Sequence, residues 1–437
     1  MRRSVLLILL LSLISGRAQS QQPDTVVRGP LTLLDAIRLG REHGVVAALA
    51  RLTARAGQAR VGQRASELLP QISGGATWTR QTVNLDEFGI PAITGVTDPF
   101  DVVRLQLRAS QTVFDAAAFA RLRAERDQAV ASGEDARAAG ELAGATAGIA
   151  YLRVLSARET VTARQADSTV AAALLDQARK LVESGVSPAI DATRSEVSFA
   201  SVLTQLEVAR NNRDRSSLDL LRALDLPPSS HVQLADSLSL ATIELPETAD
   251  DAVAYAREHR PELAAERART SAARRSLGAI RSENLPSLGL SGAMNESGAT
   301  TNALEYSYNF QVGITVPILD GFRRQRRARE QSFRVEAQEI QERDQANKVE
   351  TDARQAVLDL ASARQQVAIA ADRLRLSEQE LSQAQERFSA GVAGSVETTN
   401  AQGSLIAARD AQIQAMVNYA TARVAVYRAL GVIDQLR

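Results

Sequence analysis

Cysteine is missing from the 437-residue sequence, which excludes disulfide bonds and thiolate metal sites. The 51 basic residues equal the 51 acidic residues in number, so no basic surface for a nucleic-acid partner is expected. Aromatic residues make up only 4% of the chain, whereas residues that favour long helices are abundant. Beyond the first 20 residues, no run approaches the ~18 consecutive apolar residues of a transmembrane helix. If the chain crosses a membrane, strands must do the crossing.

Sequence signatures of enzymes are missing as well. The chain contains no phosphate loop of the G-x-x-x-x-G-K type, no dinucleotide-binding fingerprint and no G-x-S-x-G nucleophile elbow. Its histidines, His43, His231 and His259, lack the spacing of metal ligands. We therefore predict a protein that is not an enzyme and that has no catalytic residue, cofactor or metal site.

The first 20 residues have the pattern of a secretory signal peptide. Arg2 and Arg3 precede an apolar run from Val5 to Ile14, and small residues near Ala18 provide a cleavage site. The apolar run is about ten residues long, too short to span a bilayer as a helix. We expect residues 1–20 to be removed on export.

The remaining chain is two copies of one unit. Leu69-Pro70 recurs as Leu285-Pro286 at an offset of 216 (286 − 70), and Gly185-Val186 recurs as Gly391-Val392 at an offset of 206 (391 − 185). Residues between 83 and 100 are rich in Gly and Pro, and this extra loop in the first copy accounts for the change of offset. We assign the first repeat to residues 21–227, a linker to 228–248 and the second repeat to 249–437.

Each repeat contains two predicted strands. Apolar and polar residues alternate over ten or more positions, most clearly from Val103 and from Tyr306. We place the strands at about 71–82, 102–114, 286–295 and 305–317. Strands of this length with one apolar face suit a transmembrane β-barrel. Four strands cannot close a membrane barrel, because the smallest have about eight, so several chains must pool their strands, and three chains would supply twelve.

Long helices follow each strand pair. In the second repeat an apolar seam runs in steps of three and four residues from Ala353 to Phe388, which is coiled-coil spacing. We predict helical hairpins at about 115–226 and 320–431, each turning at a glycine-containing segment. The predicted fold class is α+β and mostly α, internally duplicated, with long antiparallel coiled-coil helices.

Taken together, these motifs resemble the TolC-like outer-membrane efflux protein family. The resemblance rests on the duplication, on the strand pairs that begin at Leu69-Pro70 and Leu285-Pro286, and on the hairpin segments around Gly185 and Gly391. It covers essentially the whole chain after the signal peptide. The resemblance implies a homotrimer in the outer membrane, with a twelve-stranded barrel and a periplasmic helical tunnel. It also implies work with a periplasmic adaptor and an inner-membrane pump in efflux or type I secretion.

The same resemblance implies functional residues at the periplasmic tip. The pore constriction corresponds to Glu397 and Asn400, with Asp191 and Arg194 in the first repeat. Relatives often carry an acid where Asn400 stands, so a double carboxylate ring is not expected here. A ring of three Glu397 side chains would repel anions. Alternatively, Glu397 is only a solvent-exposed charge on a helix surface and has no role in the pore. The adaptor docking turns correspond to the segments Gly185, Val186, Ser187 and Gly391, Val392, Ala393.

An arginine cluster directly follows the last strand. Arg323, Arg324, Arg326 and Arg327 open a helix, where the helix dipole disfavours cations. Outer-membrane lipid headgroups could compensate their charge, which suggests an anchor at the membrane interface. The alternative is a solvated charged first turn that pairs with Glu330.

Two functions of different classes remain. A passive export conduit predicts a trimer in the outer membrane, whereas a soluble periplasmic coiled-coil scaffold predicts release of the protein in the aqueous fraction and no pore. The alternating strands favour the conduit.

Overall fold

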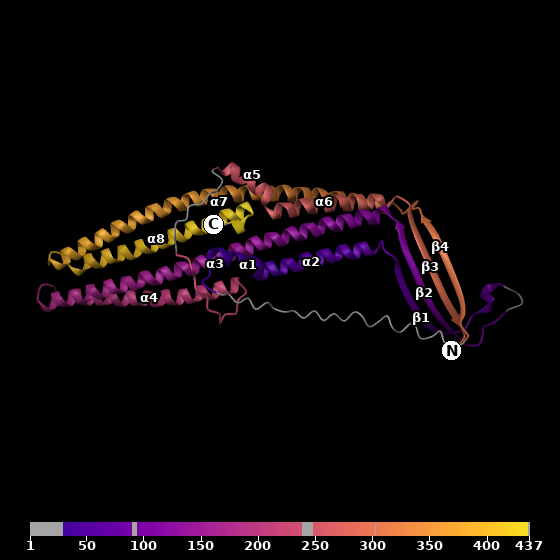
Figure 1. Ribbon diagram of the computed structural model, residues 1–437, viewed down its shortest axis with the longest axis horizontal. Helices are drawn as coiled ribbons and strands as arrows, with labels where there is room; N and C mark the ends of the chain where they lie inside the picture. Colours follow the sequence, from indigo (N-terminus) through magenta and orange to yellow (C-terminus); the bar gives the residue numbers. More distant parts are fainter. Residues whose placement is uncertain (1–28, 90–93, 238–247, 302, 436–437) are drawn as a thin grey trace.

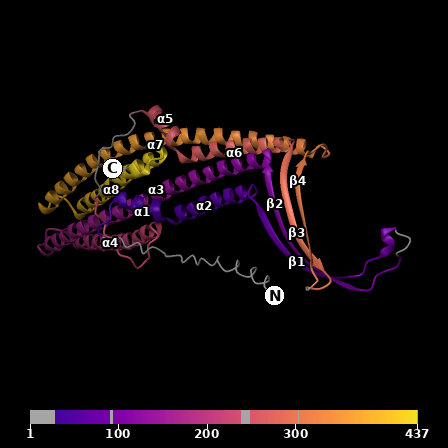
Figure 2. The same cartoon turned by 45° about the vertical axis from the view of Figure 1, so that its right-hand side comes forward.

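The computed structural model describes residues 29–89, 94–237, 248–301 and 303–435, and the chain forms a long rod with a small sheet at one end (Figure 1). The predicted signal peptide lies outside the described residues. A second view shows the sheet set at an angle to the helices (Figure 2). No helix within the described ranges combines the length and the apolar character needed to cross a membrane.

The same series of elements occurs twice, which confirms a duplicated, mostly α fold with four strands. The first copy contains α1 (Leu33–His43), α2 (Val45–Ser66), β1 (Gln71–Gln81), η1 (Leu85–Phe88), β2 (Phe100–Phe114), α3 (Ala116–Glu183) and α4 (Ala189–Ala223). The second contains α5 (Ala249–His259), α6 (Pro261–Ser282), β3 (Ser287–Gly298), β4 (Glu305–Thr315), α7 (Arg323–Ser389), α8 (Ser395–Leu430) and η2 (Ile433–Gln435).

Local capping residues fix where several helices begin. Thr32 and Asp35 form a capping box at α1, and in the second copy the Thr248 hydroxyl accepts a hydrogen bond from the Asp251 amide at 3.1 Å. The Asp115 carboxylate accepts hydrogen bonds from two amides at the start of α3. These caps satisfy amide groups that have no partner inside the helix.

The sheet has the order β1-β2-β3-β4 and is antiparallel throughout. Gly74 lies opposite Leu107, Leu107 opposite Met294 and Met294 opposite Tyr308, so these residues share one face. On this face Leu107 is 48% exposed and Tyr308 is 75% exposed. Within the described residues, neither edge strand has a further strand partner. The sheet therefore offers an uncovered apolar face and two open edges.

The longest helices make two hairpins that run away from the sheet. α3 has 68 residues and α7 has 67, which gives each a length of ~100 Å. Each packs antiparallel against its return helix, α3 against α4 and α7 against α8. Small buried residues such as Ala363 and Ala384 allow the α7 and α8 backbones to approach closely. The rod thus has no single compact core.

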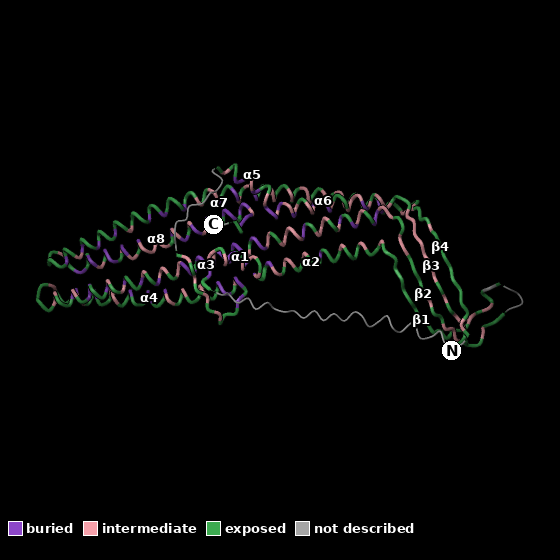
Figure 3. Tube along the Cα trace, viewed as in Figure 1, coloured by how far each residue is buried: buried purple, intermediate pink, exposed green. Residues whose placement is uncertain are grey.

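Burial is concentrated near the middle of the rod, as Figure 3 shows. There α1 lies against α3, and a Cβ atom on Gly148 would come within 2.9 Å of the Ile37 side chain. The 3₁₀ segment η2 is fixed to α3, because the buried Glu141 carboxylate accepts a hydrogen bond from the Ile433 amide at 2.8 Å. This packed middle section connects the sheet at one end of the rod to the hairpin tips at the other end (Figure 1).

Candidate functional site

The two hairpin tips have the same turn geometry. Gly185 has φ +72° and Gly391 has φ +71°, a left-handed conformation that favours glycine. One residue later, the Val186 amide donates to the Leu181 carbonyl and the Val392 amide donates to the Arg387 carbonyl. A Cβ atom on Gly391 would lie 3.2 Å from the Val186 side chain, so the two turns touch. The expected docking segments therefore form one continuous end surface.

Asp191 is buried at the contact between the hairpins. Its side chain lies in the first turn of α4, is 4% exposed and accepts a 2.6 Å hydrogen bond from the Ser395 hydroxyl at the start of α8. Arg194 approaches the same carboxylate at 3.8 Å. Asp191 thus joins the two return helices. Ser395 was not predicted from the sequence, because a buried serine 204 residues away has no local signal.

The other expected constriction residues are accessible. Glu397 is paired with Arg387 of the same hairpin at 3.0 Å, and its side chain is 44% exposed. Arg194 and Asn400 line one groove of 470 Å³ between α4 and α8, together with Val197 and Val396. The structure therefore brings Arg194 and Asn400 to one groove, while Glu397 is held toward α7.

Farther from the tip, a network of ion pairs connects the hairpins. Asp167 of α3 is 2% exposed, and its two carboxylate oxygens contact Arg164 at 2.8 Å and Arg409 of α8. Arg164 also contacts Asp410 of α8. We call these four residues the hairpin clamp. The sequence contains only one hint of it, the i,i+3 spacing of Arg164 and Asp167 on one helix.

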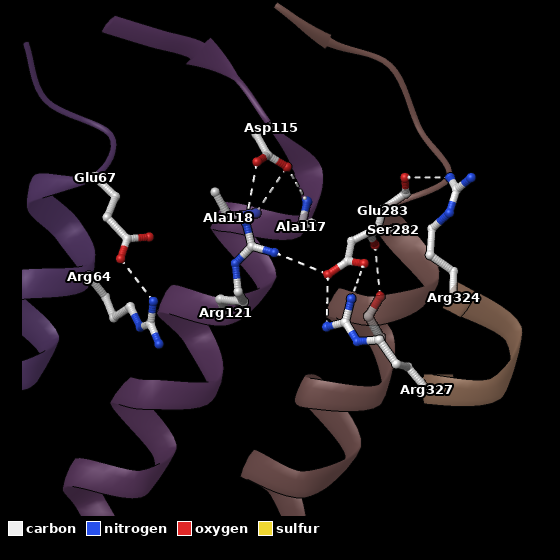
Figure 4. Close-up of polar contacts among 11 residues, drawn as sticks. Arg64, Glu67, Asp115, Ala117, Ala118, Arg121, Ser282, Glu283, Arg324 and Arg327 are labelled. Carbon is white, nitrogen blue, oxygen red and sulfur yellow. Dashed lines mark hydrogen bonds and ion pairs between the residues drawn. The ribbon is translucent and has the colours of Figure 1, made fainter. Parts of the chain in front are cut away.

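The arginine cluster lies at the neck, the junction between the strands and the helices (Figure 4). Arg324 is 8% exposed, its side chain donates to Asp320 at 2.7 Å, and it also donates to the backbone carbonyl of Glu283. The Arg324 amide donates to the same Asp320 carboxylate. These hydrogen bonds to Arg324 lower the pKa of Asp320. The anionic compensation expected at this helix start is therefore supplied from within the chain for Arg324.

Arg327 is also engaged inside the chain. Glu283, at the end of α6, lies between Arg327 at 2.8 Å and Arg121 of α3 at 3.4 Å (Figure 4). Arg323 and Arg326 are exposed. Of the four expected anchor residues, these two remain available to a membrane surface.

Within the described ranges, no group of three or more His, Asp or Glu side chains is placed to hold a metal ion.

Solved outer-membrane channels share this fold. The CmeC channel of Campylobacter jejuni superposes with a TM-score of 0.80 at 18% sequence identity, covering 91% of this chain and 85% of that one. VceC of Vibrio cholerae gives a TM-score of 0.78 at 17% identity, covering 92% of this chain and 96% of that one.

Sequence comparison extends the similarity. The pyoverdine export outer membrane protein OpmQ of Pseudomonas putida is 26% identical over 418 residues, covering 90% of this chain and 84% of the relative. TolC of Vibrio cholerae is 26% identical over 180 residues, which covers 39% of this chain and 41% of that protein. The family model described as outer membrane efflux protein matches residues 39–225 and 253–432, most of the chain. The chain belongs to the outer membrane efflux protein family.

Proposed function

We propose that three copies of this chain close into one channel, the exit duct of an efflux or type I secretion system. The protein is an outer-membrane efflux protein by family, not an enzyme. The observation that carries the trimer is the sheet, which has four strands, an exposed apolar face and two open edges. Open edges are unfavourable in lipid, because their backbone groups lack partners.

The number of strands favours three chains over two. Two chains would supply eight strands, and a barrel of that size is filled by its own side chains. Three chains would supply twelve strands and leave a lumen. In the proposed barrel, β4 of one chain pairs with β1 of the next, and Tyr308 and Leu107 face the lipid.

The first test is the mass of the protein extracted from outer membranes in a mild detergent, corrected for bound detergent. A protein mass of three chains supports the shared barrel. A monomer, or protein released in the aqueous periplasmic fraction, would contradict it and favour the soluble coiled-coil scaffold.

At the tip, we propose that the turns dock a periplasmic adaptor, which couples the channel to an inner-membrane pump. Val186 is 58% exposed and Val392 is 69% exposed, and apolar side chains at a protein's end favour contact with a partner. Changing Val186 and Val392 to aspartate should abolish adaptor-dependent export and leave the trimer intact. Export at the wild-type rate would argue against docking at these turns.

We propose that Arg194 and Asn400 line the pore constriction from the α4–α8 groove and Glu397 lines it from the side of α7, and that the buried Asp191 positions the start of α8 through Ser395. Glu397→Ala should raise single-channel conductance and weaken cation preference, because three carboxylates leave the pore. Glu196→Ala is the matched control, since Glu196 is also an exposed tip glutamate paired with an arginine, at 3.5 Å. Equal conductance in the two variants would show that Glu397 is not part of the constriction.

For the membrane interface, we propose an anchor limited to Arg323 and Arg326, whose guanidinium groups would contact lipid phosphates. Changing both to glutamate should reduce the yield of trimer in the outer membrane. Unchanged insertion would favour a solvated first turn instead.

A further inference from the structure

A cavity of 660 Å³ lies at the neck and is lined by four helices, α2, α3, α6 and α7. These helices lie side by side, each against the next (Figure 1). One cavity can touch all four only where the layer is concave. When such layers close into a ring, the concave side faces the axis. If the proposed trimer is correct, this cavity is part of the lumen.

The lining of the cavity is rich in arginine. The lining contains five arginines and two glutamates, which gives an excess of three positive charges per chain. The arginines are Arg64, Arg121, Arg269, Arg327 and Arg334, and the glutamates are Glu125 and Glu283. Glu283 is shared between two of these arginines, and Glu125 is already paired with Arg60.

The acids that pair with the other three arginines are outside the lining. Arg64 contacts Glu67 at 2.8 Å, and Arg334 contacts Glu330 at 2.6 Å with both side chains more than 60% exposed. Arg269 contacts Glu266 and Asp135. Exposed ion pairs are weak, so a guanidinium such as that of Arg334 can turn from its partner to a passing anion.

The polar face of the sheet also carries a net positive charge, because its strands place two arginines, Arg104 and Arg108, and one acid, Glu305, on this face. Arg104 and Arg108 lie on the face opposite to Leu107 and Tyr308, because strand residues alternate between faces. The cross-strand neighbours of Arg108 are Ser73 and Ala293, which carry no charge. In the proposed barrel this face is turned toward the lumen, directly above the neck.

We propose that the arginines of the neck and of the polar sheet face form a recognition surface for anionic cargo, namely solutes that carry carboxylate, sulfonate or phosphate groups. Guanidinium groups bind such oxyanions through paired N–H donors. Charges of one sign along a confined passage also raise the local concentration of the opposite ion. The inference rests on the proposed channel and names the class of solute that its neck and barrel favour; it does not concern the proposed Glu397 ring at the opposite end of the rod.

The test uses the full-length protein in planar bilayers under a KCl gradient, with the reversal potential converted to a K⁺/Cl⁻ permeability ratio. The main variant is Arg121→Gln with Arg327→Gln, which also leaves Glu283 without its two cations. The charge-preserving variant is Arg121→Lys with Arg327→Lys. The matched control is Arg274→Gln with Arg329→Gln, since these exposed arginines of α6 and α7 are outside the cavity lining and outside the proposed anchor.

We expect the K⁺/Cl⁻ ratio to rise about threefold in the main variant at low salt, where screening is weak. The lysine variant and the control should keep the wild-type ratio. Tripolyphosphate added on the barrel side should reduce the wild-type current more than that of the main variant. The same ratio in wild type and main variant, or an equal rise in the control, would overturn the inference.

If the main variant does not assemble, Arg334→Gln replaces it, because this side chain is 67% exposed and its loss should not prevent folding. An unchanged ratio in Arg334→Gln would then overturn the inference. Wild-type protein that shows no channel steps at all would instead refute the proposed function, so the two failures are distinguishable.

Discussion

Replacing Asp167 by alanine should loosen the contact between the two hairpins. The Asp167 carboxylate is 2% exposed and is shared by Arg164 and Arg409, so its removal leaves two cations without their common partner. Removing one member of a buried ion pair costs about 3–5 kcal/mol. Arg164 keeps Asp410, and Arg409 is 23% exposed and can turn to water. We therefore expect the lower end, about 3 kcal/mol, in the free energy of local opening.

Hydrogen exchange of the detergent-solubilised protein, followed by mass spectrometry, measures this opening directly. A loss of about 3 kcal/mol corresponds to roughly hundredfold faster exchange. The increase should occur in peptides around residues 160–172 of α3 and around 404–414 of α8, because the clamp joins both helices.

The matched control is Asp176→Ala on the same helix. Asp176 pairs with Lys180 at 2.6 Å, but both side chains are more than 60% exposed. The expected loss is below about 0.5 kcal/mol, less than a threefold change in exchange. Equal changes in Asp167→Ala and Asp176→Ala would refute the reasoning, as would a change confined to α3.

Three further predictions concern the middle, the neck and the tip. Tyr151→Phe removes the buried hydroxyl that donates to the Leu31 carbonyl and to the Asp236 carboxylate. The Leu31 carbonyl keeps the Ala235 amide as a donor and the Asp236 carboxylate keeps the Leu33 amide, so the loss of stability should be about 1 kcal/mol. A fall in melting temperature no larger than that of a conservative surface variant would contradict the contact. Because the pKa of Asp320 is lowered in the folded protein, its contribution to stability should be complete well above pH 3.8 and should vanish as the pH falls through the lowered pKa. The melting temperatures of wild type and Asp320→Asn should therefore differ at neutral pH and converge in acid. A difference that stays constant with pH would exclude this linkage. Gly391→Ala should destabilise the tip by about 1 kcal/mol, because φ is +71° and the added Cβ presses on Val186. The control is Gly394→Ala, where φ is −87° and no other atom lies within 4 Å of the added Cβ. Hydrogen exchange of the tip peptides should increase in Gly391→Ala and stay nearly unchanged in Gly394→Ala.

The strands illustrate how far sequence reasoning extends. β4 is readable locally, because Tyr306, Tyr308 and Phe310 alternate with polar residues over the whole strand. β1 is a weaker signal, since it is rich in glycine and other small residues. It nevertheless forms 11 residues of strand, because every residue from Gln71 to Gln81 pairs with β2. The pairing, which is not a local property, decides its length.

The functional residues differ in the same way. Both tip turns were predictable, because a glycine after a long helix favours the left-handed conformation that ends it. The role of Asp191 was not, since its partner Ser395 is 204 residues away. The neck arginines were visible as a cluster, but their individual partners, Asp320 and Glu283, follow from the way in which α7 packs beside α6.

The sequence by itself determined the duplication, the class of every long element, the glycine turns and the lack of disulfides. The duplication follows from motifs that recur at offsets of 216 and 206 residues. The other features depend on composition and on spacings of two to four residues, which set strand and helix faces directly. Only the tertiary structure decided which charges are neutralised and which line a cavity. Arg324 and Arg323 are neighbours in the chain, yet one is buried against Asp320 and the other is exposed. The physical reason is that an ion pair depends on distance in space, and the packing of helices far apart in the sequence sets that distance.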